Sequence, residues 1–278
     1  MQTRLAYLGP AGTFTEAAAM QHDSTATLDS YSSIREIYQS VVDDISNQGI
    51  VPIENSLQGS VTDTLDVLIQ ENELLIYQEL VIKIEHSLIT KPGTDPATIN
   101  TIFSHPQALG QCKLFLERHF PKALQVASLS TASAVEEVLK ANSENSAAIA
   151  NKRAALLYEA EILSDNIQDS QRNATRFVVL ARQDHKPTGQ DKTSLCISFE
   201  GDSPGLLYYS LGEFASRDIN LSKVESRPNR ETLGRYVFLI DLEGHRTQDH
   251  VSEALQALQN HTASVKILGS YPRVNTQP

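Results

Sequence analysis

The chain has 278 residues, of which 40% are hydrophobic and 21% charged, a composition typical of a soluble globular protein with about two domains. Its net charge of -11 argues against a nucleic-acid or anionic-membrane partner, because no surplus of Lys and Arg is available to neutralise phosphates. Cys112 and Cys196 match no metal-ligand spacing, which indicates free thiols in a reduced, cytoplasmic protein. No signal peptide is recognisable, and no segment approaches the roughly 18 apolar residues of a membrane span.

The N-terminal residues predict a strand, a Gly-rich turn and a helix. Residues 5–8 read as the strand, Gly9 and Gly12 allow close approach of the backbone, and Thr13 or Thr15 can cap the helix that follows. The free N–H groups of such a helix start offer an anion site. A plain tight turn explains the same residues equally well.

The next elements give a core helix and a second strand with polar residues behind it. Apolar residues recur at helical spacing over residues 34–45, at Ile34, Ile37, Val41 and Ile45, and are expected to form one core face. The apolar run 50–53 is followed by a predicted loop, 54–60, that begins with Glu54 and precedes an amphipathic helix. Glu54 is either a buried acid with a raised pKa or an exposed loop residue.

Further polar residues follow later predicted strands. Residues 74–84 are strand formers that cross from one lobe to another, and the strand 101–103 leads into a polar turn, 104–107, and a helix that continues to Phe120. On their own, His105 and Gln111 are explained as solvated residues. A strand at 124–127, a helix at 131–141 and a strand at 147–150 continue the alternation. Four strand-to-helix junctions with polar residues predict a cleft between two α/β lobes.

The stretch Asn173-Ala174-Thr175-Arg176 leads into the apolar run 177–180, a predicted buried strand. A hydroxyl beside a guanidinium at the mouth of a strand suits an anionic substrate. The alternative is that both residues merely lead into a core strand.

The C-terminal third predicts a separate domain. Residues 182–191 are polar, contain Pro and Gly, and are expected to be a linker. The pattern that follows is strand 193–199, helix 204–217, strand 219–225, strand 234–241, helix 248–259 and strand 263–268. This βαββαβ order is the ferredoxin-like arrangement.

Together these motifs resemble a known family, the monofunctional prephenate dehydratases with a C-terminal ACT regulatory domain. The catalytic motifs stand here as Gly9-Pro10-Ala11-Gly12-Thr13-Phe14, Pro52-Ile53-Glu54-Asn55-Ser56, Ser104-His105-Pro106-Gln107 with Gln111-Cys112, and Asn173-Ala174-Thr175-Arg176-Phe177. The ACT motif that is associated with phenylalanine stands as Glu225-Ser226-Arg227-Pro228, with Asn220-Leu221 before it. The resemblance covers nearly the whole chain.

The resemblance implies an α/β fold with a two-lobed catalytic domain like a type 2 periplasmic binding protein, followed by a ferredoxin-like ACT domain. We expect the catalytic domain at 1–181, with a crossover near 77–84 and a return near 165–175, the linker at 182–191 and the ACT domain at 192–278. The implied assembly is a homodimer or homotetramer. No chorismate mutase segment is expected before the catalytic domain, which starts at Leu5.

The implied reaction converts prephenate to phenylpyruvate, water and CO2 in L-phenylalanine biosynthesis, and it demands neither a cofactor nor a metal. Thr175 is expected to hydrogen-bond the leaving hydroxyl, and Glu54 is a candidate proton source if it is buried. Asn55, Ser104 and Gln111 are carried over as catalytic residues that position the substrate. The expected substrate-binding residues are Gly12, Thr13, Ser56, His105, Arg176 and Phe177.

L-phenylalanine is the implied allosteric effector. Its expected contacts are Gly205, Leu206, Leu207, Asn220, Leu221, Glu225, Ser226, Arg227 and Pro228. The family usually has Ala where this chain has Leu206, and the added bulk affects the expected effector affinity. Two alternatives stay open: an arogenate dehydratase, and a non-catalytic amino-acid sensor.

Overall fold

The structure is a computed structural model that describes residues 2–140, 145–201, 203–228 and 236–274. It divides into two units, one of Met1–Thr64 with Val81–Phe177 and one of Leu65–Leu80 with Val178–Pro278. The boundary between the units falls inside α3 (Thr62–Gln70), β5 (Leu75–Lys83) and β11 (Ala174–Ala181). Within the described residues, no helix is long and apolar enough to cross a bilayer.

The first sheet has the strand order β2-β1-β3-β11-β5, and β4 pairs with β3. Parallel pairing joins β1 to both β2 and β3. The remaining strands of this sheet are β1 (Arg4–Leu8), β2 (Thr27–Tyr31), β3 (Gln48–Asn55) and β4 (Gly59–Ser60). Helices α1 (Phe14–His22) and α2 (Ile34–Val42) follow β1 and β2. Thr13, one of the two predicted candidates, caps α1, and Ser33 caps α2.

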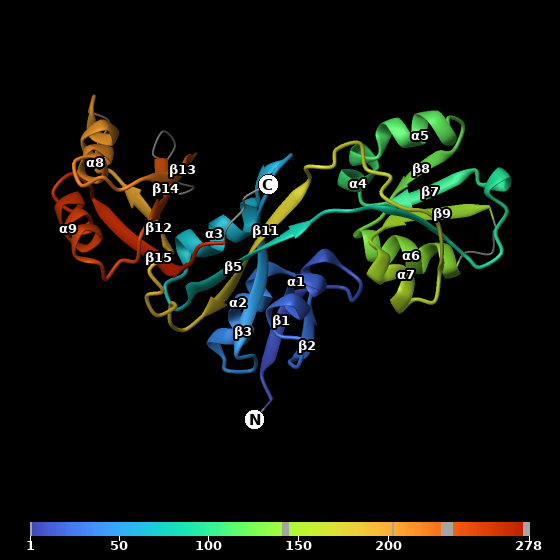
Figure 1. The fold of residues 1–278 in the computed structure, drawn as a ribbon, viewed down its shortest axis with the longest axis horizontal. Helices are drawn as coiled ribbons and strands as arrows, with labels where there is room; N and C mark the ends of the chain where they lie inside the picture. Colours follow the sequence, from blue (N-terminus) through green and yellow to red (C-terminus); the bar gives the residue numbers. More distant parts are fainter. Residues whose placement is uncertain (1, 141–144, 202, 229–235, 275–278) are drawn as a thin grey trace. The chain divides into compact units, whose positions relative to one another are not determined.

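The second sheet lies in the same unit and has the order β10-β6-β9-β7-β8. Its strands are β6 (Ser87–Thr90), β7 (Thr101–Ser104), β8 (Leu124–Ala127), β9 (Ser146–Ala150) and β10 (Glu161–Ser164). Its helices are α4 (Pro106–Gln111), α5 (Lys113–His119), α6 (Thr131–Lys140) and α7 (Lys152–Leu157), with a 3-10 turn η1 at Pro96–Thr98. Figure 1 shows α4 and α5 on one side of this sheet and α6 and α7 on the other.

Strand β9 explains why this sheet is covered on both faces. Ala147 and Ile149 pack toward the cluster of α4 and α5, whereas Ala148 and Ala150 pack toward α6 and α7. Successive strand residues point to opposite faces, so a continuously apolar strand requires two apolar layers. All four side chains are fully buried.

The second unit contains the predicted strand-helix-strand-strand-helix-strand order. Its elements are β12 (Asp191–Ser198), α8 (Leu206–Ala215), β13 (Leu221–Pro228), β14 (Tyr236–Glu243), α9 (Asp249–Leu258) and β15 (Ser264–Pro272). Strand order is β13-β14-β12-β15, with antiparallel pairs. A buried ion pair joins this sheet to the 65–80 segment, because Lys192 Nζ lies 3.0 and 2.9 Å from the two carboxylate oxygens of Glu79.

Several sequence predictions require correction. Ile45 lies beyond the end of α2 and its side chain is 53% exposed, so it is no part of the core face. Strand β3 extends through Glu54 and Asn55, which were predicted to be loop residues. The predicted helix through Phe120 is two helices that meet at Cys112. The strands β2, β6 and β10 and the helix α7 were missed.

The two cysteines are free, as predicted from their spacing, and the structure shows that both are buried. Burial raises the pKa of the Cys112 thiol to about 12 and that of the Cys196 thiol to about 11. The predicted linker residue Asp184 pairs with Arg246 at 2.8 Å, so this segment is anchored to the second unit. The predicted domain limits at 181 and 192 stay a prediction.

We expect Gly269→Ala to lower the free energy of unfolding by at least about 2 kcal/mol. Gly269 has φ +144°, and a Cβ atom there would lie 2.3 Å from the carbonyl oxygen of Ile76, a backbone atom that cannot move aside. Urea denaturation of the variant measures the loss. The matched control is Gly212→Ala inside α8, where the added Cβ meets open space and helix propensity favours Ala by about 1 kcal/mol. Equal stability of both variants would contradict the proposed backbone clash.

Candidate active site

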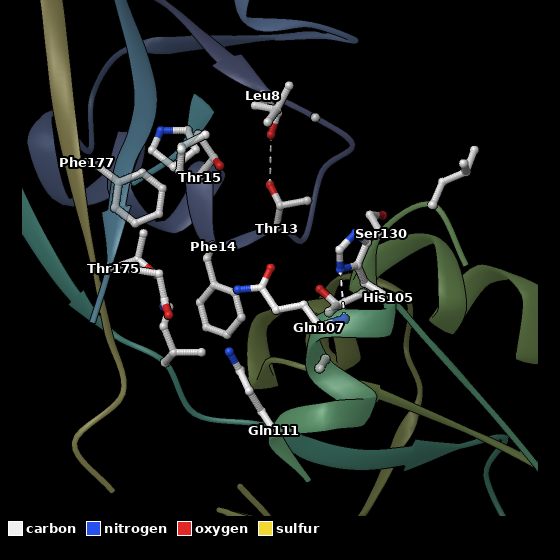
Figure 2. Close-up of a pocket in the computed structure, with 18 of the residues that line it drawn as sticks. Leu8, Thr13, Phe14, Thr15, His105, Gln107, Gln111, Ser130, Thr175 and Phe177 are labelled. Atoms are coloured by element: carbon white, nitrogen blue, oxygen red, sulfur yellow. Dashed lines mark hydrogen bonds between the residues drawn. The ribbon is translucent and has the colours of Figure 1, made fainter. Parts of the chain in front are cut away.

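A cavity of about 610 Å³ lies within the first unit, between elements of its two sheets. Figure 2 shows most of the residues that form it, with Phe14 and Thr15 near Thr175 and Phe177, Thr13 beside Leu8, and His105, Gln107 and Gln111 at the start of α4 and along it. Its lining is Leu8, Gly9, Thr13, Phe14, Thr15, Ser32, Pro52, Asn55, Val61, Asp63, Ile84, His86, His105, Gln107, Ala108, Gln111, Leu129, Ser130, Thr131, Thr175 and Phe177. Polar groups thus converge on one cavity from loops and strand ends, as the junction pattern predicted.

Strand β11 decides which residues of the Asn173–Phe177 motif reach this cavity. Thr175 and Phe177 both line it, whereas Arg176 does not. Successive residues of a strand point to opposite faces, so the arginine between them projects the other way. It meets Glu54 on the neighbouring strand β3, with Arg176 Nη2 3.6 Å from Glu54 Oε2. The structure therefore does not bring the predicted guanidinium, or the predicted acid, into the cavity lining.

Asn55 orients the hydroxyl of Thr175. The Asn55 Oδ1 atom accepts hydrogen bonds from the backbone N–H groups of Leu57 and Gln58, at 3.0 and 3.2 Å. Because those two groups can only donate, the side-chain amide is fixed with its nitrogen pointing the other way. This nitrogen donates to Thr175 Oγ1 at 2.9 Å. The buried threonine oxygen is already an acceptor, so its own proton is available to a ligand.

The same orientation continues through two further amides. Asn55 Nδ2 also donates to Asn173 Oδ1 at 2.9 Å, and Asn173 Nδ2 donates to Gln111 Oε1 at 2.9 Å. The ring nitrogen Nε2 of His86 lies 2.8 Å from the same Gln111 oxygen. Thr175, Gln111 and His86 are therefore members of one continuous network, called here the amide relay, which runs through Asn55 and Asn173.

The N-terminal ends of α1 and α6 contribute further polar groups to the cavity lining. Thr13 caps α1 by accepting from Glu16 N, and its hydroxyl donates to the Leu8 carbonyl at 3.1 Å. Ser130 accepts from Ser133 N at 2.9 Å at the start of α6. The first-turn N–H groups of a helix lack intrahelical acceptors and favour anions. None of the cavity-lining residues, all of which are described, is Lys or Arg, so these dipoles and neutral donors are the groups with which the lining can meet an anion.

The Gly-rich turn makes contacts between elements of the first unit, and the predicted substrate contact of Gly12 stays a prediction. Gly12 has φ +85° and lies outside the lining, and its N–H donates to Glu16 Oε2 at 2.7 Å. Its carbonyl accepts from Asn151 Nδ2 at 2.9 Å, and Glu16 pairs with Arg153 at 2.8 Å. Asn151 and Arg153 belong to the start of α7, beside the second sheet. The turn therefore joins the two lobes of the first unit.

Two other predicted residues support the site from outside its lining. The Ser56 hydroxyl donates to the Arg172 carbonyl at 3.1 Å and accepts from Ala174 N at 3.0 Å, which anchors the strand that carries Thr175. Ser104 is fully buried and donates to the Ile149 carbonyl at 2.6 Å, inside the second sheet. Both serines are close in sequence to residues of the lining, but each hydroxyl donates its hydrogen bond to a backbone carbonyl.

Sequence reasoning assigned no role to several lining residues, most notably His86, Ser130 and Thr131. His86 stands alone between two strands with no motif around it. The run of Ser and Thr before α6 is a recognisable helix cap, and this signal was available from the sequence. Phe14 and Asn173 belong to the recognised motifs but had no predicted role of their own.

Two histidines that line the cavity have pKa values that burial lowers. Burial lowers the pKa of His86, and the hydrogen bond with Gln111 opposes this shift. Burial also lowers the pKa of His105, whose Nδ1 accepts from Gln107 N at 3.3 Å. Across the described residues, no group of three His, Cys, Asp or Glu side chains is placed to hold a metal ion.

The predicted effector residues lie in the second unit. Gly205 has φ +94° and precedes α8, which begins with Leu206 and Leu207. Strand β13 carries Leu221 and the predicted ACT motif and lies at the edge of its sheet, and Asn220 directly precedes it. Glu225 pairs with Lys223 at 3.1 Å and Arg227 with Asp66 at 3.5 Å. Ser226 and Pro228 are exposed on this strand.

An α/β unit with a cavity of this size and a few fixed polar groups is typical of a small-molecule enzyme or binding protein. The family model described as prephenate dehydratase matches residues 5–185. The chain belongs to the prephenate dehydratase family, which is a family of hydro-lyases.

The similarity to known relatives covers almost the whole chain. A bifunctional chorismate mutase/prephenate dehydratase of Pseudomonas aeruginosa is 39% identical over 97% of this chain and 73% of its own. The crystal structure of an Arthrobacter aurescens prephenate dehydratase in complex with L-Phe has a TM-score of 0.92 and 36% identity, covering 99% of this chain and 92% of its own. A structure of GqqA, described as a novel type of quorum-quenching acylase, has a TM-score of 0.88 and 29% identity, covering 98% of both chains.

We expect Glu16→Gln to destabilise the protein by about 1–2 kcal/mol at pH 7, because it removes a charged acceptor from Gly12 and Arg153. Burial raises the pKa of Glu16, but the hydrogen bonds from Arg153 and Gly12 outweigh it and hold the pKa below its ordinary 4.5. This stabilisation is therefore complete above about pH 4.5 and is lost as pH falls through the folded pKa. Urea denaturation of variant and parent, from pH 7 down to pH 3, measures the difference.

The control is Glu117→Gln, which removes an exposed carboxylate 3.7 Å from Lys113. An exposed pair of this kind contributes under about 0.5 kcal/mol. A difference for Glu16→Gln that stays constant down to pH 3 would contradict the assignment to an ionised carboxylate.

Proposed function

We propose that this chain is a prephenate dehydratase that converts prephenate to phenylpyruvate, water and CO2 in L-phenylalanine biosynthesis. Family membership supports the reaction type, and a catalytic region built like a type 2 periplasmic binding protein is part of the proposal. The observation that carries it is the hydrogen bond from Asn55 to Thr175, because it leaves the threonine proton able to donate into the cavity. A positioned donor is what a poor hydroxide leaving group requires.

The balanced reaction explains what this donor does. The prephenate dianion takes up one proton, the bond between ring carbon and hydroxyl breaks, and the ring carboxylate leaves as CO2 while its bonding electrons enter the aromatic ring. Negative charge develops on the departing oxygen. A hydrogen bond from Thr175 Oγ stabilises that charge, and its value increases in a cavity that excludes water.

The carboxylates of prephenate are assigned to neutral donors and helix starts. The cavity faces the N-terminal turns of α1 and α6, through Thr15 and Thr131, and it also contains the side chain of Gln107. Arg176 and Glu54 pair with each other outside the lining, so the proposal gives them no contact with the reacting atoms. Phe177 and Phe14 provide apolar surface for the ring, and fixing the ring also fixes the torsion of the departing carboxylate.

We expect Thr175→Val to lower turnover of prephenate by roughly a hundredfold or more, because it keeps the shape of the side chain and removes the hydrogen-bond donor. The assay follows phenylpyruvate formation by purified variant and parent protein. Thr94→Val is the matched control, since Thr94 is equally buried at 9% exposure but its hydroxyl donates to the Lys91 carbonyl outside the cavity. Near-normal turnover by Thr175→Val would remove this residue from the mechanism.

Regulation by L-phenylalanine is proposed for the second unit as an ACT domain. Support comes from its strand and helix order and from the Arthrobacter aurescens relative, which was solved in complex with L-Phe. The edge strand β13 exposes alternate residues and suits pairing with a second copy, so the proposed assembly is a homo-oligomer. Leu206, at the start of α8, adds bulk beside Gly205, where the effector backbone is expected.

We expect L-phenylalanine to change the rate of prephenate turnover and to raise the melting temperature, since a ligand at 100 times its Kd stabilises by about 2.7 kcal/mol. Leu206→Ala should shift this response to a roughly tenfold lower concentration, which corresponds to about 1.4 kcal/mol of relieved crowding. D-phenylalanine is the control ligand. A response of neither activity nor melting temperature would remove the effector from the proposal.

The likeness to GqqA favours one further candidate activity, that of an acylase, because a shared fold hosts different reactions. An acylase would need Thr175 as a nucleophile rather than as a hydrogen-bond donor. Arogenate turnover and amino-acid binding without turnover are two more candidate functions. Parallel assays of one preparation with prephenate, with arogenate and with an acyl amide separate all four functions.

A further inference from the structure

His86 is a cavity residue whose role the family motifs leave open. It directly precedes β6, is 2% exposed and lines the cavity. Its ring packs edge-on against Phe14, with centroids 5.7 Å apart and an interplanar angle of 83°. The Nδ1 atom is buried and has no hydrogen-bond partner among the described residues. A buried polar atom without a partner is unfavourable, and a ligand can supply the missing hydrogen bond.

The amide relay determines which ring nitrogen of His86 carries the proton. Backbone N–H groups fix the oxygen of Asn55 as an acceptor, so its nitrogen donates to Asn173, whose nitrogen in turn donates to Gln111 Oε1. The Gln111 oxygen can only accept, and His86 Nε2 lies 2.8 Å from it. Nε2 therefore carries the proton. In the neutral ring, Nδ1 presents a bare lone pair.

Gln111 presents the opposite group beside it. Its oxygen is committed to His86 and Asn173, and its nitrogen Nε2 is buried without a partner among the described residues. Two hydrogen-bonded residues of the cavity lining thus carry one donor and one acceptor that have no partner among the described residues. A hydroxyl group, which accepts and donates at once, is the simplest ligand group that satisfies both.

We propose that His86 is a further substrate-binding residue, and that its Nδ1 accepts the hydrogen bond donated by the ring hydroxyl of the substrate. The inference rests on the proposed dehydratase function. The carboxylates and the keto oxygen of the prephenate dianion only accept, so its hydroxyl is the donor that matches Nδ1. With its proton held by His86, the hydroxyl turns its lone pairs toward donors, among them Gln111 Nε2 and Thr175 Oγ.

This arrangement gives kcat/KM a defined pH dependence. Protonation of Nδ1 removes the acceptor, so kcat/KM falls as pH decreases through the pKa of His86, which burial places below 6.5. The groups packed on the ring, Phe14 and Gln111, do not titrate. The other titratable side chains among the lining residues are Asp63 and His105. A variant of His86 is therefore needed to assign the pH dependence of kcat/KM to this residue rather than to Asp63 or His105.

The test compares His86→Gln with His22→Gln in the full-length protein. His22 is a matched control, because its Nε2 also lies close to a glutamine oxygen, that of Gln48 at 2.7 Å, and its Nδ1 is also buried without a partner among the described residues, yet it lies outside the cavity lining. We expect kcat/KM for prephenate to fall about 10- to 100-fold in His86→Gln, the loss of one buried hydrogen bond, and to stay unchanged in His22→Gln. Inhibition by phenylpyruvate, which has no ring hydroxyl, should be equal in all three proteins.

Two further measurements separate binding from folding. The acid limb of the pH profile should persist in His22→Gln and disappear in His86→Gln. In the unaltered protein, the ¹⁵N chemical shifts of the His86 imidazole should show protonated Nε2 and bare Nδ1, and prephenate should shift the Nδ1 signal. The inference is overturned by a protonated Nδ1, by parent-like turnover in His86→Gln, or by equally weakened phenylpyruvate inhibition. Absence of prephenate turnover by the parent protein would instead overturn the proposed function, and the imidazole shifts would still decide the tautomer.

Discussion

The two backbone N–H groups of Leu57 and Gln58 set the polarity of the candidate active site. Both donate to the side-chain oxygen of Asn55, and a backbone N–H can only donate. Every subsequent amide in the relay is oriented by the one before it. The result is a threonine that can donate, a glutamine nitrogen that can donate and a histidine nitrogen that can accept, all on residues that line one cavity. A turn at the end of β3 thereby determines the hydrogen bonding of Thr175, more than a hundred positions later in the chain, and, through Asn173, that of Gln111 and His86.

Much of this arrangement could be predicted from the sequence. The strand-to-helix junctions near Thr13, Asn55 and His105 were each marked by polar residues after an apolar run, and Thr175 was marked by the polar residues that lead into one. The structure places all four residues in one cavity. The βαββαβ order of the second unit was read from its apolar periodicity and is confirmed by the order of the elements. These features depend on local signals, which a sequence records directly.

Two predicted site residues, Arg176 and Glu54, lie outside the cavity lining for a reason that they share, the geometry of a strand. The sequence places Thr175 beside Arg176 and Glu54 beside Asn55, and both pairs were assigned to one site. Within a strand, however, neighbours point to opposite faces, so one residue of each pair lines the cavity and the other two meet on the far side. His86 was missed for a different reason. The role of His86 depends on its hydrogen bond with Gln111, which Asn173 also contacts. These contacts form only in the folded chain, and no sequence pattern near residue 86 predicts them.

A cavity for a dianion without Lys or Arg in its lining is consistent with the chemistry it has to perform. An ion pair to the departing carboxylate would stabilise the substrate, whereas catalysis requires stabilisation of the charge that develops on the hydroxyl oxygen. Neutral donors held by the relay do not have to reorganise when that charge appears. The cations near the site serve its framework instead: Arg153 pairs with Glu16 and thereby holds the Gly-rich turn and the start of α1 against α7. The Arg153–Glu16 pair thus fixes the walls of the cavity, and the proposed function leaves the contacts with the ligand to oriented dipoles.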